Sequence, residues 1–480
     1  MKRYPLVLMM FLVQSLMPGL LPVSLVAQAR PIALNPLNPH YFIYKEKPAI
    51  LVTSGEHYGA VINKDFDYIT YLDELKSKRL NLTRTFTGAY VEPLGAFKID
   101  KNSLAPAPGR FICPWLRSST PGYAKGGNKF DLTQWDTAYF NRLKKFVSAA
   151  GKRDIIVELA LFCPFYEEVQ WKLSPLNTIN NINGLGKVPR TDVYTLDKGN
   201  GLLSVQETLV RKIVNELKDF DNLVYEICNE PYFGGVTMEW QHHIADIIAE
   251  TEKPFQARHL VTQNIANGAG TIIDPHPAVS VFNFHYASPP YAVAQNYNLD
   301  KVIGDNETGF AGNSNDTYRR EGWEFLMAGG GLYNNLDYSF TVGHEKGTFV
   351  YPSTQPGGGS ADLRRQLGYL KNFLHSFEFV LMKPDSMLII NGPAEKFRPY
   401  ALVEPGKQYA IYSYGNMRPN VEFLIPAGTY EVEWMNPLTG KIDKKTILKH
   451  GGGKVELQSP KNSKEIALSI IKVGYKKMKK

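Results

Sequence analysis

Short apolar runs alternate with amphipathic helical patterns through most of the chain. The runs predict strands at 49–52, 80–86, 154–162, 223–228, 259–263, 279–285, 301–304 and within 325–337, after a shorter cap strand at 41–44. Helical patterns occupy 65–78, 132–150, 203–220, 240–252 and 361–382. About eight strand–helix units predict a parallel sheet closed into a (β/α)8 TIM barrel. No glycine-rich nucleotide fingerprint follows a strand, which argues against an open doubly wound sheet.

The pattern changes after Pro384. Short runs of strand-forming residues follow at 400–403, 408–413, 421–425, 429–434 and 465–470. Turn signals such as Pro405-Gly406 and Gly451-Gly452-Gly453 separate them. We therefore expect a barrel over 30–385 and a small C-terminal antiparallel β-sandwich over 386–480.

The first 29 residues are typical of a signal peptide. Lys2 and Arg3 precede an apolar stretch over 5–26, and Ala27-Gln28-Ala29 forms a small-x-small cleavage site. This predicts export, to the periplasm or the medium. The alternative is an N-terminal membrane anchor, because the stretch is long enough to span a bilayer. No other segment is apolar enough, so the mature chain is expected to have no membrane span.

The composition mainly argues against particular classes of function. The 480 residues are 44% hydrophobic and carry a formal charge of +8, to which the lysine-rich end at 476–480 contributes. No basic–aromatic array indicates nucleic-acid binding. The three cysteines, Cys113, Cys163 and Cys228, are odd in number and are expected to be buried free thiols. Without zinc-type spacing or a phosphate loop, we expect no cofactor and no catalytic metal. Nothing in the pattern indicates an oligomeric state.

Two glutamates follow apolar strands at the point where each strand ends. Glu230 lies in Tyr225-Glu226-Ile227-Cys228-Asn229-Glu230-Pro231, and Glu307 in Asp305-Asn306-Glu307-Thr308-Gly309. Strand ends at the carboxyl face of a barrel are where catalytic residues sit. A pair of carboxyl groups there has the composition that glycosidic bond cleavage requires. The alternatives are a surface loop carboxylate for Glu230 and a helix N-terminal acid for Glu307.

Other polar residues at strand ends are candidates for the surrounding site. The Asn229 amide is expected to bind a sugar hydroxyl. Arg84 either orients and ionises the nucleophile or forms a structural pair with Glu226. His285 and Tyr286 close a strand that directs them to the barrel mouth.

Two further candidates have structural alternatives. His57 follows the first strand, where a site role and a core role are equally compatible with the pattern. Trp171 either stacks on a sugar ring or pins the long loop over 163–201, which in turn is a candidate for closing one end of a groove. As a general acid, Glu230 is expected to have its pKa raised by the neighbouring carboxylate.

The motifs together resemble clan A glycoside hydrolases, and most closely the family 5 cellulase-type enzymes. The resemblance covers about 50–382 and rests on Asn81-Leu82-Thr83-Arg84, on the segments containing Glu230 and Glu307, and on His285-Tyr286. It implies that Glu230 is the acid/base and Glu307 the nucleophile, with Arg84, Asn229, His285 and Tyr286 supporting them. Family 5 often has a Trp at the tip of strand eight, whereas 332–340 contains Tyr333 and Tyr338 and no Trp. The segment Trp434–Gly440 resembles the collagen-binding-type β-domain often appended to such barrels.

The sequence thus predicts a retaining β-glycoside hydrolase that acts on a polysaccharide or oligosaccharide by a two-glutamate double displacement, in the manner of an endo-glucanase. An exo-acting β-glycosidase of the same clan is the first alternative. A non-catalytic carbohydrate-binding protein built on an inactive barrel is the second.

Overall fold

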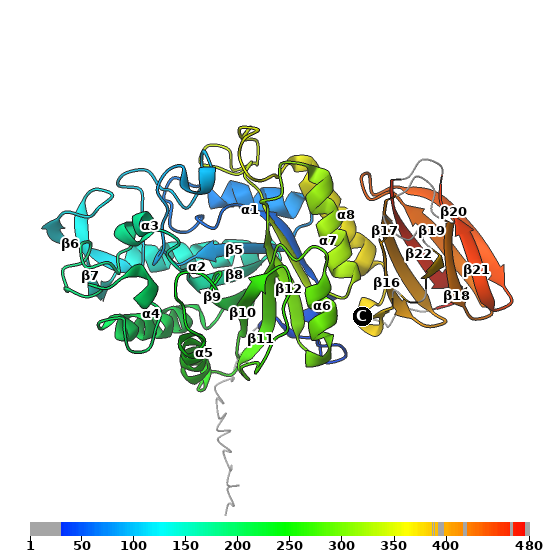
Figure 1. Cartoon of the computed structure of the whole chain (residues 1–480), viewed down its shortest axis with the longest axis horizontal. Coiled ribbons are helices and arrows are strands. Elements are labelled where there is room, and N and C mark those ends of the chain that lie inside the picture. The colour runs from blue at the N-terminus through cyan, green and yellow to red at the C-terminus, as the bar shows by residue number, and fades with distance from the viewer. Residues whose placement is uncertain are drawn as a thin grey trace, which may run out of the picture.

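A computed structural model describes residues 30–385, 387, 389–391, 398–415, 420–460 and 464–475. The predicted signal peptide lies outside these residues. Figure 1 shows a larger α/β body beside a smaller body made of strands. Within the described part of the chain, no helix combines the length and the apolar character needed to cross a membrane.

The larger body is built on eight parallel strands. They are β4 (Leu51–Gly55), β5 (Leu82–Phe86), β8 (Ile156–Phe162), β9 (Leu223–Cys228), β10 (Leu260–Asn267), β11 (Val279–His285), β12 (Val302–Thr308) and β13 (Leu332–Leu336). They pair in the order β4-β13-β12-β11-β10-β9-β8-β5. The two end strands approach each other, and Asn81 N donates to Val52 O at 3.1 Å across the gap. The prediction of a TIM barrel is confirmed.

Helices surround this sheet (Figure 1). They are α1 (Tyr68–Ser77), α2 (Thr137–Gly151), α3 (Glu168–Leu173), α4 (Leu202–Leu217), α5 (Met238–Glu252), α6 (Tyr291–Asn296), α7 (Asn315–Met327) and α8 (Ala361–His375). Local sequence explains the starts of α1 and α2, where the side chains of Asp67 and Asp136 cap the first free backbone amides. The sequence pattern did not predict α7, because polar and charged residues interrupt its apolar face.

The connection between β5 and β8 is longer than the apolar pattern suggested. It contains the segment 87–114 and a hairpin of β6 (Trp115–Pro121) and β7 (Asn128–Trp135). Helix α2 therefore begins at Thr137 and not at the predicted 132. A small antiparallel sheet of β1 (Ala33–Leu34), β2 (Phe42–Tyr44) and β3 (Lys47–Ala49) precedes the first barrel strand, and β2 matches the predicted cap strand.

The smaller body is an antiparallel sandwich. One sheet has the order β14-β16-β17-β22-β19-β20 and the other β15-β18-β21. Its strands are β14 (Lys383–Pro384), β15 (Ile389–Asn391), β16 (Arg398–Glu404), β17 (Gln408–Tyr414), β18 (Asn420–Ile425), β19 (Gly428–Met435), β20 (Ile442–His450), β21 (Gly453–Gln458) and β22 (Glu465–Lys472). The sequence pattern did not predict strands β20 and β21, because they are largely exposed and polar. The predicted sandwich class is confirmed.

The sandwich packs against the outer helices of the barrel, on the side of α7 and α8 (Figure 1). Trp323 of α7 stacks on Tyr412 of β17 with ring centroids 4.9 Å apart. Arg319, also on α7, donates from Nε to Glu465 of β22 at 3.0 Å. Both members of this ion pair are buried. All three cysteines are buried and free, as expected.

Candidate active site

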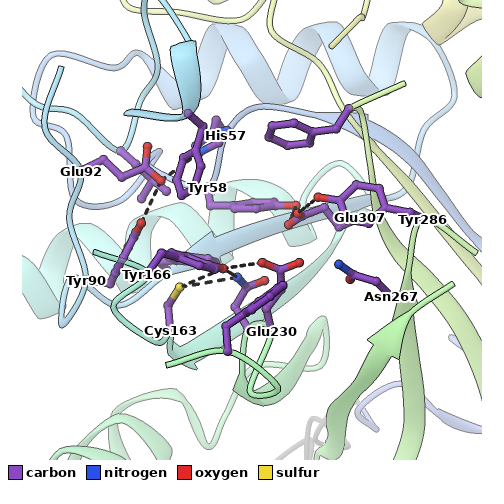
Figure 2. Close-up of a pocket in the computed structure, with 16 residues that line it drawn as sticks. His57, Tyr58, Tyr90, Glu92, Cys163, Tyr166, Glu230, Asn267, Tyr286 and Glu307 are labelled. Atoms are coloured by element: carbon purple, nitrogen blue, oxygen red, sulfur yellow. Dashed lines mark hydrogen bonds and ion pairs between the residues drawn. The ribbon is translucent and has the colours of Figure 1, made fainter. Parts of the chain in front are cut away.

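A cavity of about 320 Å³ opens at the carboxyl ends of the barrel strands (Figure 2). Its lining is rich in aromatic side chains and contains three carboxylates. The lining residues are His57, Tyr58, Phe86, Tyr90, Glu92, Phe97, Leu104, Cys163, Tyr166, Asn229, Glu230, Phe233, Asn267, Tyr286, Glu307 and Phe310. Flat apolar faces with a few polar groups are suited to a sugar ring.

Glu230 follows β9 in a backbone conformation that is unusual for a glutamate. Its φ is 39°, and its backbone N–H donates to Asn264 Oδ1 of β10 at 3.0 Å. The side chain accepts hydrogen bonds from Tyr166 at 2.6 Å and from Tyr232 at 3.3 Å. Left-handed non-glycine residues that are held in place by their surroundings cluster at active sites.

Glu307 lies within β12 and accepts three hydrogen bonds. Tyr58 donates to Oε2 at 2.8 Å, Tyr286 to Oε1 at 2.7 Å, and Arg84 Nη1 to Oε2 at 3.2 Å. Tyr58 and Tyr286 are also left-handed, with φ of 59° and 54°. Donors on both oxygens hold the carboxylate in one orientation.

The two glutamates face each other across His285. One oxygen of each carboxylate and one ring nitrogen of the histidine all lie within 4.8 Å of one another. His285 Nδ1 is 3.1 Å from Glu230 Oε1 and 3.6 Å from Glu307 Oε1. The pair that the sequence placed on separate strand ends is therefore brought together by the barrel.

Arg84 contacts both of the partners that the sequence left as alternatives, Glu226 and the nucleophile candidate Glu307. Its Nε donates to Glu226 Oε2 at 2.9 Å, and its Nη2 contacts Glu226 Oε1, while Nη1 contacts Glu307. Nη2 also donates to Asn229 Oδ1 at 2.6 Å. One buried guanidinium thus fixes both the nucleophile candidate and the residue before Glu230.

The proton distribution differs from the sequence expectation. Burial alone favours the neutral form of Glu230, but the hydrogen bond and charge of His285 outweigh it, with help from Tyr166, and hold the pKa below its usual value. Burial lowers the pKa of His285, yet Glu307 and Glu230 outweigh it and raise that pKa. The prediction of a raised pKa for Glu230 was wrong, because it left out the imidazole that sits between the carboxylates.

His285 contacts both carboxylates from one side of its ring. Its Nε2 is buried and has no partner among the described residues. The ring therefore interacts with the two carboxylates through Nδ1 alone. A proton on this nitrogen lies within hydrogen-bond distance of Glu230.

Three residues that the sequence predicted to bind substrate differ in how they lie relative to the cavity. Asn229 lines the cavity, but its amide is already engaged, because Oδ1 accepts from Arg84 and Nδ2 donates to Tyr166 at 2.8 Å. Trp171 does not line the cavity; its buried indole donates to Val188 O at 3.1 Å and so pins the loop. His57 does line the cavity.

Several site residues were not singled out from the sequence. Tyr166 follows β8 in Cys163-Pro164-Phe165-Tyr166, the same strand-end position that identified Glu230, and this was the signal available. Tyr90 and Glu92 lie in the segment 87–114, which no periodic pattern identifies. Tyr232 is two positions after Glu230, in the exit loop.

Neither Tyr333 of β13 nor Tyr338, which follows that strand, replaces the missing tryptophan of strand eight. Tyr333 donates to Tyr318 O and faces α7. Tyr338 lies beside the cavity, where its ring meets Phe310 edge-on at 6.1 Å. Phe310, from the loop after β12, is the ring that lines the cavity there.

Within the described residues, Glu230, His285 and Glu307 form the one group of three side chains that is close enough to share a metal ion. Tyrosine hydroxyls and Arg84 already bind its carboxylates. A buried arginine on the same carboxylate opposes a cation there. The arrangement suits two carboxyl groups acting on a bond between them.

Comparisons with known proteins agree with this geometry. Residues 110–257 match the family model Cellulase (glycosyl hydrolase family 5), a span that includes Glu230 and ends before Glu307. A glycoside hydrolase family 5 structure from Bacteroides vulgatus superposes with a TM-score of 0.65 at 13% identity, over 93% of this chain and 94% of that chain.

A second solved structure, named glycoside hydrolase, superposes with a TM-score of 0.64 at 15% identity, over 94% of this chain and 98% of that chain. A comparison with curated proteins gives no match. The structural likenesses establish the shared fold, and the family match confirms the resemblance to family 5 and identifies a glycoside hydrolase.

Proposed function

We propose that this glycoside hydrolase cleaves β-glycosidic bonds with retention of configuration, with Glu230 as acid/base and Glu307 as nucleophile. The observation that carries the proposal is the separation of the carboxylates, whose nearest ligand oxygens lie within 4.8 Å of each other. Retaining enzymes hold the two groups about 5–5.5 Å apart, whereas inverting enzymes need about 6.5–9.5 Å to admit a water.

The contacts give each glutamate a distinct role. Glu307 is oriented by hydrogen bonds from Tyr58, Tyr286 and Arg84, as an attacking carboxylate requires. Among the residues that the structure describes, no arginine contacts Glu230, and His285 Nδ1 lies 3.1 Å from its Oε1. In the first step the proton on His285 Nδ1 passes through Glu230 to the leaving oxygen, the glycosidic bond breaks, and Glu307 bonds to the anomeric carbon. In the second step Glu230 deprotonates a water, which displaces Glu307.

The substrate is a β-linked polysaccharide or oligosaccharide. The sequence favoured an endo-glucanase-like action on an open groove, with export to the periplasm or the medium. The cavity favours the exo-acting alternative, because the segment 87–114 covers one side of it with Tyr90, Glu92, Phe97 and Leu104. A non-catalytic role is disfavoured, because an inactive barrel has no need of two carboxylates oriented by tyrosines.

A slowly released fluorinated sugar tests the mechanism. A 2-deoxy-2-fluoro glycoside with an activated leaving group is expected to label Glu307, identified by peptide mass mapping. The product formed from normal substrate is expected to keep its anomeric configuration by NMR. Inverted product, or a label on Asp305 near Glu321 of α7, would overturn the assignment.

A further inference from the structure

The cavity contains a second carboxylate–imidazole pair that the retaining mechanism does not use. His57 Nε2 lies 3.3 Å from Glu92 Oε1, and both residues line the cavity. Figure 2 shows Glu92 and Asn267 on opposite sides of the Glu230–Glu307 pair. His57 is 6% and Glu92 2% exposed, so their polar atoms face other protein groups or the cavity.

Glu92 is held firmly. It accepts hydrogen bonds from Tyr90 at 3.1 Å and from Asn102 Nδ2 at 3.0 Å, in addition to His57. Lys125, at the tip of the β6–β7 hairpin, donates to the backbone oxygen of Glu92 at 2.9 Å. The side chain and the main chain of this residue are therefore both fixed before any ligand binds.

A close backbone contact fastens the same segment to the first barrel strand. Gly59 N donates to Ser103 Oγ at 3.1 Å. A Cβ at Gly59 would lie 2.1 Å from the backbone carbon of Ser103, so no other residue fits at this position. The 87–114 segment is thus built against the loop that carries His57 and Tyr58, and it forms a fixed side of the cavity.

His57 has an unused hydrogen-bonding atom. Its Nδ1 is buried and has no partner among the described residues. Burial lowers the pKa of His57, but the charge of Glu92 outweighs it and raises that pKa. In the neutral ring, with Nε2–H facing Glu92, Nδ1 accepts a hydrogen bond; in the charged ring it donates one. A sugar hydroxyl satisfies either state, because it both donates and accepts.

The pair lies on the nucleophile's side of the cleaved bond. The His57 ring stacks on that of Tyr58, with centroids 5.6 Å apart, and Tyr58 donates a hydrogen bond to Glu307. The sugar that becomes attached to Glu307 is the glycone, and the leaving group departs on the side of Glu230. A group beside His57 is therefore a hydroxyl of the glycone.

We propose that His57 and Glu92 bind hydroxyls of the terminal, non-reducing sugar and so make this enzyme exo-acting. The inference rests on the retaining mechanism proposed above and adds which sugar the cavity accepts. A chain that continued beyond the glycone would have to displace Glu92 and the segment that carries it. The ligand class is a single terminal glycosyl residue, linked to any leaving group that fits on the side of Asn267.

The smallest substrates separate exo from endo action. The wild-type enzyme is incubated with the 4-nitrophenyl β-D-glycosides of glucose, mannose, galactose and xylose, and in parallel with the corresponding polysaccharides. Exo action predicts hydrolysis of at least one monosaccharide glycoside and release of monosaccharide from the start of the reaction. Cleavage of a polysaccharide into long fragments, with every aryl monosaccharide refused, would overturn the inference and leave the retaining mechanism intact.

Variants test the residues. With the best aryl glycoside, Glu92→Gln and His57→Gln are each expected to lower kcat/KM about 10- to 100-fold, the effect of losing one hydrogen bond to a charged group. Monodeoxy analogues of the glycone sharpen the test. Removing the hydroxyl that faces His57 is expected to cost the wild type about 10-fold or more and the variants less than about 3-fold.

The matched control is Glu252→Gln. Glu252 forms another buried carboxylate–imidazole pair, with His259 Nδ1 at 2.5 Å, before β10 and away from the cavity. This variant is expected to lose stability but to keep the wild-type preference among the deoxy analogues. If Glu92→Gln and His57→Gln also keep that preference, the pair is structural and the inference fails. If Glu307 is not labelled in the wild type, the proposed mechanism fails instead.

Discussion

Two buried arginines hold together two different parts of the molecule. Arg84 lies in the barrel mouth and Arg319 at the junction with the sandwich, and each is 2% exposed. Arg319 contacts Glu465 with Nε at 3.0 Å, and Gln366 with Nη1 at 2.9 Å. Arg84 contacts Glu226 with Nε and Nη2, just as Arg319 contacts Glu465 with these two atoms. Unlike Arg319, it also reaches a carboxylate in the cavity, that of Glu307. The same type of ion pair thus docks the sandwich on the barrel in one place and positions the nucleophile candidate in the other.

The difference lies in what surrounds the carboxylates. Glu465 is 4% exposed and meets Tyr412 and Arg319, so its hydrogen bonds end in the protein. Glu307 faces a cavity, and its donors leave it free to contact a ligand. A closed buried pair contributes to specific docking, while an open one keeps a charged group available at the cost of stability. The comparison predicts that a substitution in the Arg84 pair affects mainly activity, and that the equivalent substitution in the Arg319 pair affects mainly stability.

The largest expected effect is on Glu230. Glu230→Ala removes the proton donor, so substrates with poor leaving groups are expected to slow about 10²- to 10⁴-fold in glycosylation. Activated aryl glycosides need little protonation and are expected to lose far less in that step. Pre-steady-state rates on both substrate types check this. Equal losses on both would contradict the acid/base role.

Arg84→Lys tests the open pair. The ammonium can still pair with Glu226, but it loses the planar fork that also reaches Glu307. We expect kcat to fall about 10²- to 10³-fold with a small change in the melting temperature. A variant that melts much earlier but keeps its specific activity would show that Arg84 is structural.

Arg319→Lys makes the matching change in the closed pair. It removes the bidentate contact with buried Glu465 and the contact with Gln366, and is expected to lower the free energy of unfolding by about 1–3 kcal/mol. Specific activity at low temperature is expected to change less than about 3-fold. Denaturant unfolding and initial rates measure the two effects. A large loss of activity in the folded variant would mean that the sandwich influences the site.

The smallest expected effect is on pH dependence. His285 has a raised pKa, so it is protonated below that value and loses its proton as the pH rises through it. The alkaline limb of kcat/KM is therefore expected above pH 6.5, the usual value for histidine. In His285→Gln the limb is expected to move by about one pH unit or more, because Glu230 then holds its proton without the imidazole. An unchanged profile would assign the limb to another group.

Much of the barrel followed from local pattern. Strands β8, β9 and β11 consist mostly of apolar residues because parallel strands are buried on both faces. Helix α7 could not be predicted in the same way, because its buried face includes Arg319, Glu321 and Glu324. These side chains are buried against the sandwich and neighbouring elements. A periodic pattern of apolar residues cannot indicate such partners, because they lie elsewhere in the sequence.

The sequence by itself determined that two carboxylates stand at strand ends, because an apolar run followed by a polar tip is a local property. Only the tertiary structure decided what surrounds them. Tyr58 reaches Glu307 across 249 positions, and Arg84 reaches it across 223. Glu92 lies in a segment without periodicity, yet a backbone contact at Gly59 places that segment in the cavity. Closure of the barrel converts such distant positions into neighbours, and the pKa of Glu230 depends on those neighbours.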